Sequence, residues 1–256
     1  MRLDRALSKL GIASRSEAKQ LIASGRVRVG GRVVTDPARL VPDEAASITL
    51  DREPPQRRTW RTIAMNKPRG VVTTRRDPQG RRTVFDVLGE AGRGLVAVGR
   101  LDMASTGLLL LTNDTQLANR LTDPAEAVVR RYVVTVRGAV DDAAPRQMVK
   151  GIDGLAAKSV AIRKRSSRET HLLVELVEGK NREIRRMFAA LGHEVTRLMR
   201  VMFGPIELGT LQPGQWRALA RDAFSGGAGQ QAGEYNDLDE THSFDDAARG
   251  SRRRVQ

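Results

Sequence analysis

Short apolar runs that alternate with polar turns extend from Thr62 to about Ala220, and this pattern limits the possible folds more than any other feature of the chain. Runs of four to eight apolar residues bounded by turn residues are typical of buried strands. Two helices are predicted among them, over 115–121 and 182–191, the second with Asn181 as its N-cap and Gly192 as its stop. The sequence therefore predicts a sheet-rich α+β domain.

The first fifty residues have a different pattern. Apolar residues recur at helical spacing over 3–10, and the capping-box sequence 14–17 opens a second helix. Valines on both sides of Gly30-Gly31 predict a tight hairpin, and Ile48-Thr49-Leu50 predicts a further short strand. We expect a small separate unit of two helices and a few strands.

Two segments without apolar periodicity flank the larger domain. Residues 51–61 contain a proline pair and four arginines, which is typical of an interdomain linker. Residues 234–246 contain six acids and no base, and we expect the tail that includes them to be disordered. The predicted organisation is a small domain over 1–51, a linker over 52–61, a larger domain over 62–220 and a disordered tail over 221–256.

Composition favours nucleic acid as the partner. The formal net charge is +14, a sign and size that attract polyanions. The absence of cysteine excludes disulfides, a thiol nucleophile and thiolate metal sites, and three histidines without ligand spacing give little material for a metal centre or a Ser-His-Asp triad. No apolar run approaches the roughly 18 residues of a membrane span. We expect a cytoplasmic protein with no membrane association, no metal and no cofactor.

Positive charge is concentrated at the N-terminus. Residues 1–33 contain eight basic side chains and two acidic ones, a balance that a solvated surface also explains. The order of elements, from Arg2-Leu3-Asp4 to Gly31-Arg32-Val33, resembles the S4 RNA-binding domain. The resemblance implies docking on structured RNA through phosphate contacts. The residues that it implies for these contacts are Arg5, Lys9, Arg15, Lys19 and Arg28.

One carboxylate stands out in the larger domain. Asp102 lies between two apolar strand-like runs and is bracketed by Gly99 and Gly107. Loops at strand ends often present catalytic groups, and a carboxylate near buried strands needs a cation or several donors to stay ionised. An aspartate at this spacing also fits a simple turn cap. The spacing leaves both interpretations open.

Four motifs in order resemble the pseudouridine synthases of the RsuA and RluB type. They are Met65 to Gly70 with its Lys-Pro turn, Gly99-Arg100-Leu101-Asp102 followed by Ser105-Thr106-Gly107-Leu108, Arg131-Tyr132, and Glu178 to Met187. An S4 domain ahead of them is an arrangement common in this branch. The resemblance implies a catalytic domain with a mixed, mainly antiparallel sheet. It also implies isomerisation of uridine in RNA to pseudouridine, a reaction that consumes no cofactor.

The resemblance also implies roles for individual residues. Asp102 is the essential carboxylate, which either attacks the ribose or uracil or removes a sugar proton. Arg185 pairs with Asp102, and Tyr132 stacks on the flipped uracil. The further RNA contacts implied or predicted in this domain are Lys67, Arg69, Arg100 and Arg186. Without the resemblance, Tyr132 fits a core position and the helix arginines fit a solvated face.

These observations predict a pseudouridine synthase that modifies a specific uridine in ribosomal RNA. Segments 181–187 and 195–200 are more similar to the large-subunit enzymes, particularly the RluB group, than to the small-subunit ones. The alternatives are the same chemistry on small-subunit RNA and a non-catalytic RNA-binding factor of ribosome assembly. A metal-dependent nuclease fits poorly, because the sequence lacks clustered carboxylates. Free RNA and an assembly intermediate both remain possible substrates, and we expect a monomer.

Overall fold

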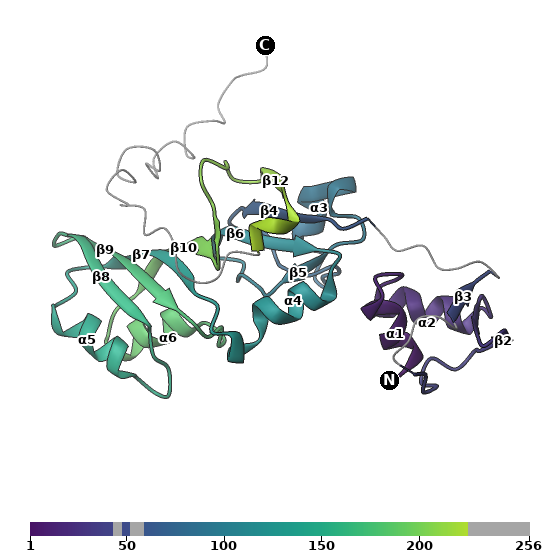
Figure 1. Ribbon diagram of the computed structural model, residues 1–256. Helices are drawn as coiled ribbons and strands as arrows, with labels where there is room; N and C mark the ends of the chain where they lie inside the picture. The colour runs from purple at the N-terminus through teal and green to yellow at the C-terminus, as the bar shows by residue number, and fades with distance from the viewer. Residues whose placement is uncertain (43–47, 52–58, 225–256) are drawn as a thin grey trace, which may run out of the picture.

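The structure is a computed structural model that describes residues 1–42, 48–51 and 59–224. Figure 1 shows a small N-terminal unit and a larger unit built on one long sheet. The predicted linker lies mostly outside the described residues, as does the predicted tail. The segment Arg221–Phe224, which the sequence assigned to the tail, forms a short 3-10 helix (η4) instead. Regular structure therefore continues past the predicted boundary at Ala220.

The N-terminal unit has the two helices and the hairpin that its sequence predicts. Its elements are α1 (Leu3–Lys9), α2 (Arg15–Ala23), β1 (Val27–Val29), β2 (Arg32–Val33) and β3 (Ile48–Leu50), with strand order β2-β1-β3. The predicted capping box is present, because Glu17 N donates to Ser14 Oγ at 3.3 Å and Ser14 N donates to the Glu17 carboxylate at 2.8 Å. Fully buried Leu3, Leu7 and Ile22 hold the helices against the strands.

The larger unit is organised around a sheet of nine strands within the described residues. The order is β12-β4-β6-β10-β7-β9-β8, with β5 beside β6 and β11 beside β10. Among the strands of this sheet that the structure describes, only β6 and β10 pair in parallel, so the predicted mixed, mainly antiparallel sheet is confirmed. The strands are β4 (Thr62–Lys67), β5 (Val96–Val98), β6 (Thr106–Thr112), β7 (Arg130–Arg137), β8 (Ser159–Arg165), β9 (Glu169–Leu176), β10 (Val195–Phe203), β11 (Ile206–Glu207) and β12 (Trp216–Leu219).

Both faces of this sheet are covered, and the central strand β6 explains why. Leu109 and Leu111 belong to one core cluster, together with Phe188 of a helix on that face. Leu108 and Leu110 belong to a second cluster on the opposite face. Because side chains alternate along a strand, a run of four leucines indicates a strand buried on both faces. The uninterrupted apolar run therefore places β6 in the interior of the sheet.

Helices and short 3-10 turns connect the strands. They are α3 (Val84–Leu88), α4 (Thr115–Thr122), α5 (Ala143–Lys150), α6 (Glu183–Ala190), η2 (Gly89–Gly92) and η3 (Pro124–Glu126). The predicted helices α4 and α6 are confirmed, whereas the sequence did not predict α3, which has only five residues, or α5. The predicted N-cap at Asn181 is wrong. Arg182, in the left-handed conformation at φ 50°, precedes α6, and the Glu183 carboxylate accepts a bond from Lys180 N at 3.2 Å.

Candidate active site

A cleft of about 340 Å³ contains the two residues that the sequence singled out most strongly. Asp102 reaches it from the loop between β5 and β6, and Tyr132 reaches it from β7. A further part of the wall comes from the segment 179–184, which leads into α6. The fold thus brings together three of the four motifs that lie far apart in the sequence.

The loop that carries Asp102 is held by the segment that follows β4. Thr73 Oγ donates to Leu101 O at 2.8 Å and accepts a longer bond from Leu101 N at 3.3 Å. Gly70 N donates to Met103 O at 2.8 Å. These bonds fix the backbone on both sides of Asp102. Sequence analysis missed Thr73, since a threonine in a loop gives no local signal of the backbone that it will meet.

Lys67 has a different position from the one predicted. Its side chain is fully buried at the end of β4, and Nζ donates to Ser105 O at 2.8 Å and Pro68 O at 3.0 Å. Burial lowers the pKa of Lys67 to about 8, and the negative charge of Asp102 partly offsets that effect. An ammonium with no exposed surface and two carbonyl partners does not reach an RNA phosphate. The predicted phosphate contact is therefore corrected to a contact that holds the loop carrying Asp102.

The depressed pKa of Lys67 predicts a pH-dependent stability. The pKa is about 8 in the folded chain against 10.5 for an exposed lysine, so the unfolded state binds more protons between these values. At pH values below about 8, the buried charge of Lys67 therefore lowers the free energy of unfolding. This destabilisation disappears as the pH rises and Lys67 loses its proton in the folded chain. We expect wild-type protein to gain stability relative to Lys67→Met between about pH 7.5 and about pH 9.5. Urea denaturation of both proteins at both pH values measures the free energy of unfolding. If that free energy changes equally with pH in the two proteins, the prediction is wrong.

The cation nearest to Asp102 is also not the predicted one. Arg182 Nη1 lies 3.9 Å from Asp102 Oδ2 in a partly exposed ion pair. Arg185 Nη1 instead donates to Val195 O at 2.7 Å, at the start of β10. The buried Nε and Nη2 of Arg185 have no hydrogen-bond partner among the described residues. Burial lowers the pKa of Arg185, and the nearby charge of Asp102 opposes this shift. Arg185 is thus close enough to interact with Asp102, but its side chain is directed to a backbone carbonyl.

Tyr132 is both a core residue and part of the cleft wall. It is 8 % exposed and packs in the main core cluster, while also lining the cleft. The core interpretation and the ligand-facing interpretation are therefore compatible at this position. The ring is held by its surroundings, so it loses little conformational freedom when a planar group packs against it.

Two buried arginines line the cleft beside Tyr132, and sequence analysis did not single them out. Arg130 donates to four backbone carbonyls, and Arg200 Nε donates to Leu108 O at 2.7 Å. Their guanidinium groups lie 4.8 and 4.9 Å from the centre of the Phe203 ring. Burial lowers the pKa of Arg130. Arginines at alternate positions within apolar strands could have identified these residues. Side chains at every second position of a strand point to the same face, which is the inward face here.

The other predicted RNA contacts lie on surfaces. Arg100 lines the cleft, and the charge of Arg69 acts on Arg185, so both lie near the site. Arg186 is exposed on α6 and does not line the cleft. On the N-terminal unit Arg28 is half-buried and donates to Gly31 O at 3.0 Å. The remaining predicted contacts of that unit are exposed: Arg5, Lys9, Arg15 and Lys19.

No group of three or more His, Asp or Glu side chains in the described part of the chain is arranged to hold a metal ion. No helix in that part is both long enough and apolar enough to cross a bilayer.

Comparisons with known proteins agree with the motifs. A family model described as RNA pseudouridylate synthase matches residues 61–190, and the S4 domain model matches residues 1–45. An uncharacterized RNA pseudouridine synthase of Aquifex aeolicus is 38% identical over 224 residues, which cover 86% of this chain and 90% of that protein. Ribosomal large subunit pseudouridine synthase B of Escherichia coli (strain K12) is 40% identical over 230 residues, which cover 85% of this chain and 79% of that protein.

A solved structure is similar as well. The crystal structure of a pseudouridylate synthase has a TM-score of 0.63 and 26% sequence identity, and the match covers 88% of this chain and 98% of that chain. The two family models together match most of the N-terminal unit and residues 61–190 of the larger one, including the loop that carries Asp102. The chain therefore belongs to the RNA pseudouridylate synthase family, in the branch that carries an N-terminal S4 domain.

Proposed function

We propose that this enzyme converts one specific uridine of large-subunit ribosomal RNA to pseudouridine. The observation that carries the proposal is the meeting of Asp102 and Tyr132 in one cleft that buried arginines line. The substrate class is supported by the similarity to ribosomal large subunit pseudouridine synthase B. Segments 181–187 and 195–200, on which the sequence prediction rests, lie in and beside the wall of this cleft.

The cleft supplies what uridine isomerisation needs. The bond between N1 of uracil and the ribose breaks, the base turns, and C5 joins the same ribose carbon; C5 loses a proton and N1 gains one. A base inside a helix must first leave the stack, and Tyr132 offers the flipped uracil a ring to pack on. Such stacking contributes about 1–3 kcal/mol per base. Asp102 acts as the carboxylate, either as a nucleophile or as a base that removes a sugar proton.

A purely RNA-binding role explains the site less well. A protein that only binds RNA gains nothing from a partly exposed carboxylate beside a negatively charged backbone. Asp102 has an exposed fraction of 34 % in its side chain, and three backbone or side-chain anchors hold its loop. An acid held this firmly in a cationic cleft is better explained by chemistry than by binding.

The two arginines near Asp102 are expected to differ in importance. Two buried nitrogen atoms of Arg185 have no partner in the part of the chain that the structure describes, and these are available to Asp102 or to bound RNA. A buried hydrogen bond to a charged group is worth about 1.5–3 kcal/mol, so Arg185→Gln is expected to lower kcat/KM by about 10²-fold. The exposed Arg182 pair is worth about 0–1 kcal/mol, so Arg182→Gln is expected to lower it less than about fivefold. Steady-state kinetics of both variants test this ranking, and the reverse order would refute it.

The remaining assignments follow from the organisation of the chain. The S4 domain over 1–51 docks on structured RNA, and the domain over 62–220, extended by η4, carries out the reaction. The residues proposed to contact RNA are Arg5, Lys9, Arg15, Lys19, Arg28, Arg69, Arg100 and Arg186. The enzyme acts in the cytoplasm as a monomer, on free ribosomal RNA or on an assembly intermediate.

One experiment tests the substrate. Purified protein is incubated separately with unmodified transcripts of large- and small-subunit ribosomal RNA, and pseudouridine is mapped by carbodiimide adducts and primer extension. A stop at one uridine of the large-subunit transcript is the expected result. A stop in the small-subunit transcript alone would overturn the substrate assignment. The absence of stops in both, repeated on partly assembled subunits, would favour the binding factor.

A further inference from the structure

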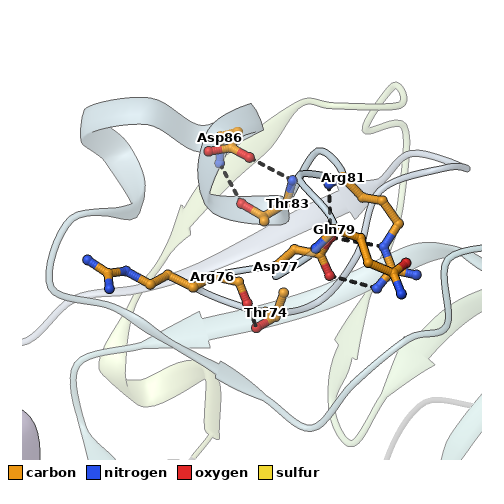
Figure 2. A network of polar contacts seen from close by, with 7 residues as sticks. All are labelled: Thr74, Arg76, Asp77, Gln79, Arg81, Thr83 and Asp86. Atoms are coloured by element: carbon orange, nitrogen blue, oxygen red, sulfur yellow. Dashed lines mark hydrogen bonds and ion pairs between the residues drawn. The ribbon is translucent and has the colours of Figure 1, made fainter.

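An arginine-rich turn lies next to the catalytic loop, and the reaction described above does not use it. We call residues 74–82, which follow β4 and precede α3, the arginine turn (Figure 2). It contains four arginines and a single acid, Asp77, so its net charge is +3. Thr73, the residue before it, holds Leu101 beside Asp102. The arginine turn is therefore tied directly to the loop that carries the catalytic carboxylate.

Two of its arginines have contacts within the protein. Arg75 donates to Leu95 O and lies over the Phe85 ring at 4.5 Å. Arg81 makes a two-point contact with the Asp77 carboxylate, with Nη2 at 2.6 Å and Nε at 3.0 Å. These two guanidinium groups stabilise the turn itself and are not directed at a ligand.

The other two arginines are exposed. Within the described residues, the side chains of Arg76 and Arg82 make no hydrogen bond and no ion pair. Figure 2 shows the Arg76 side chain extending away from the turn, on the side opposite to Arg81. The charge of Arg82 contributes to the lowered pKa of Asp86, so Arg82 lies near the start of α3. Both guanidinium groups are available to a partner.

Asp77 keeps the turn in one conformation. Its carboxylate accepts bonds from Gln79 N at 3.2 Å and from Arg81 N at 2.9 Å, in addition to the Arg81 guanidinium. Only 4 % of the Asp77 side chain is exposed. The bonds to Arg81 lower the pKa of Asp77 to about 2, so it stays charged at neutral pH.

Both ends of the turn are fixed as well. Thr74 Oγ donates to Arg76 O at 2.8 Å at the first end. At the second end Thr83 N donates to Asp86 at 2.8 Å and Asp86 N donates to Thr83 Oγ at 3.1 Å, which forms the capping box of α3 (Figure 2). The exposed arginines thus project from a backbone that is already ordered.

We propose that Arg76 and Arg82 bind phosphates of the RNA strand that flanks the target uridine, and that the Asp77-held turn presents them. Guanidinium groups match phosphate geometry, and an ordered turn loses little entropy on binding. The connection through Thr73 places this contact beside the loop of Asp102, so it aligns the strand with the cleft. The inference rests on the proposed function and adds a second RNA contact that is separate from the S4 domain.

Salt dependence tests the contact. Each phosphate contact contributes a slope of about 0.7–0.9 to the plot of log affinity against log salt concentration. At about 0.1 M salt this corresponds to a roughly five- to eightfold higher affinity per contact. The double variant Arg76→Gln, Arg82→Gln is expected to lose about 1.5 from the slope and about 30-fold in affinity for the large-subunit transcript. KM is expected to rise by a similar factor, while kcat at saturating RNA changes less than about twofold.

A matched control removes two charges elsewhere. Arg146 and Lys150 lie on α5, at the other end of the sheet from α3 (Figure 1). Arg146→Gln, Lys150→Gln is expected to leave the slope unchanged. Equal slopes for the two double variants would overturn the proposal. If wild-type protein modifies the RNA and both variants bind equally, only this inference fails; if wild-type protein modifies no RNA, the proposed function fails.

The variant Asp77→Asn distinguishes two explanations of RNA binding by the arginine turn. In one, the ordered turn presents the arginines to RNA; in the other, only the net positive charge of the turn matters. The substitution removes one negative charge, so a simple electrostatic patch would bind RNA more tightly. If Asp77 presents the arginines, the loss of its bonds to Arg81 disorders the turn and RNA binds more weakly. We expect several-fold weaker binding at about 0.1 M salt. Tighter binding by Asp77→Asn would overturn the role of the ordered turn.

Discussion

Asp102→Asn is expected to lower the rate of pseudouridine formation by at least about 10³-fold. An amide has nearly the same shape as a carboxylate, but it neither accepts a proton at neutral pH nor attacks an electrophilic carbon. The side chain of Asp102 is partly exposed, and its ion pair with Arg182 spans 3.9 Å. We therefore expect the variant to fold normally and to bind RNA with nearly wild-type affinity.

Single-turnover primer-extension assays at saturating RNA measure this rate, and urea denaturation checks the fold. Asp153→Asn is a suitable control, because Asp153 is exposed and its φ of 50° is a conformation that asparagine tolerates. It should leave the rate unchanged. If Asp102→Asn keeps more than about a tenth of the wild-type rate, the carboxylate is not essential to the chemistry.

Gly107→Ala is expected to have the largest effect on stability. A Cβ at this position would lie 2.3 Å from Arg200 O and 2.8 Å from Arg200 N, and the backbone φ is +96°. These are backbone atoms of β10 at the point where β6 and β10 pair in parallel. Neither strand can move away without breaking the centre of the sheet. We expect a loss of more than about 3 kcal/mol in the free energy of unfolding.

Gly192→Ala separates the steric clash of an added Cβ from the backbone strain of alanine at a positive φ. Gly192 also has a positive φ, +79°, but a Cβ there would meet nothing within 4 Å. Its substitution should cost only about 1–2 kcal/mol. Urea denaturation of both variants gives the comparison, and equal losses would show that the close approach of β10 at Gly107 is not the cause.

Gly107 also links the sheet to the active site. It pairs with Lys67 across β4 and β6, and Lys67 in turn holds Ser105 O in the loop that carries Asp102. A displacement of the strands at this point moves the backbone that positions the carboxylate. Any folded fraction of Gly107→Ala is therefore expected to lose activity as well, which the primer-extension assay measures.

Features that depend on nearby residues were determined by the sequence. The capping box at Ser14 and Glu17 involves residues three apart, and the run Leu108 to Leu111 fixes β6 as a strand buried on both faces. The motif around Asp102, through its resemblance to a family, indicated in the same way a loop that lines the cleft. These signals lie within a few positions of one another, so the chain expresses them without reference to its tertiary fold.

Which charged side chains meet was decided only by the tertiary structure. Lys67 is buried against Ser105 O, 38 residues away, and Arg185 donates to Val195 O while Arg182 approaches Asp102. Arg182 has a left-handed backbone directly ahead of α6, so it stands at the N-cap position that Asn181 was expected to occupy. Burial and ion pairing depend on segments that fold against each other from distant parts of the chain. Local sequence therefore names the charged residues of the site, while packing determines their partners.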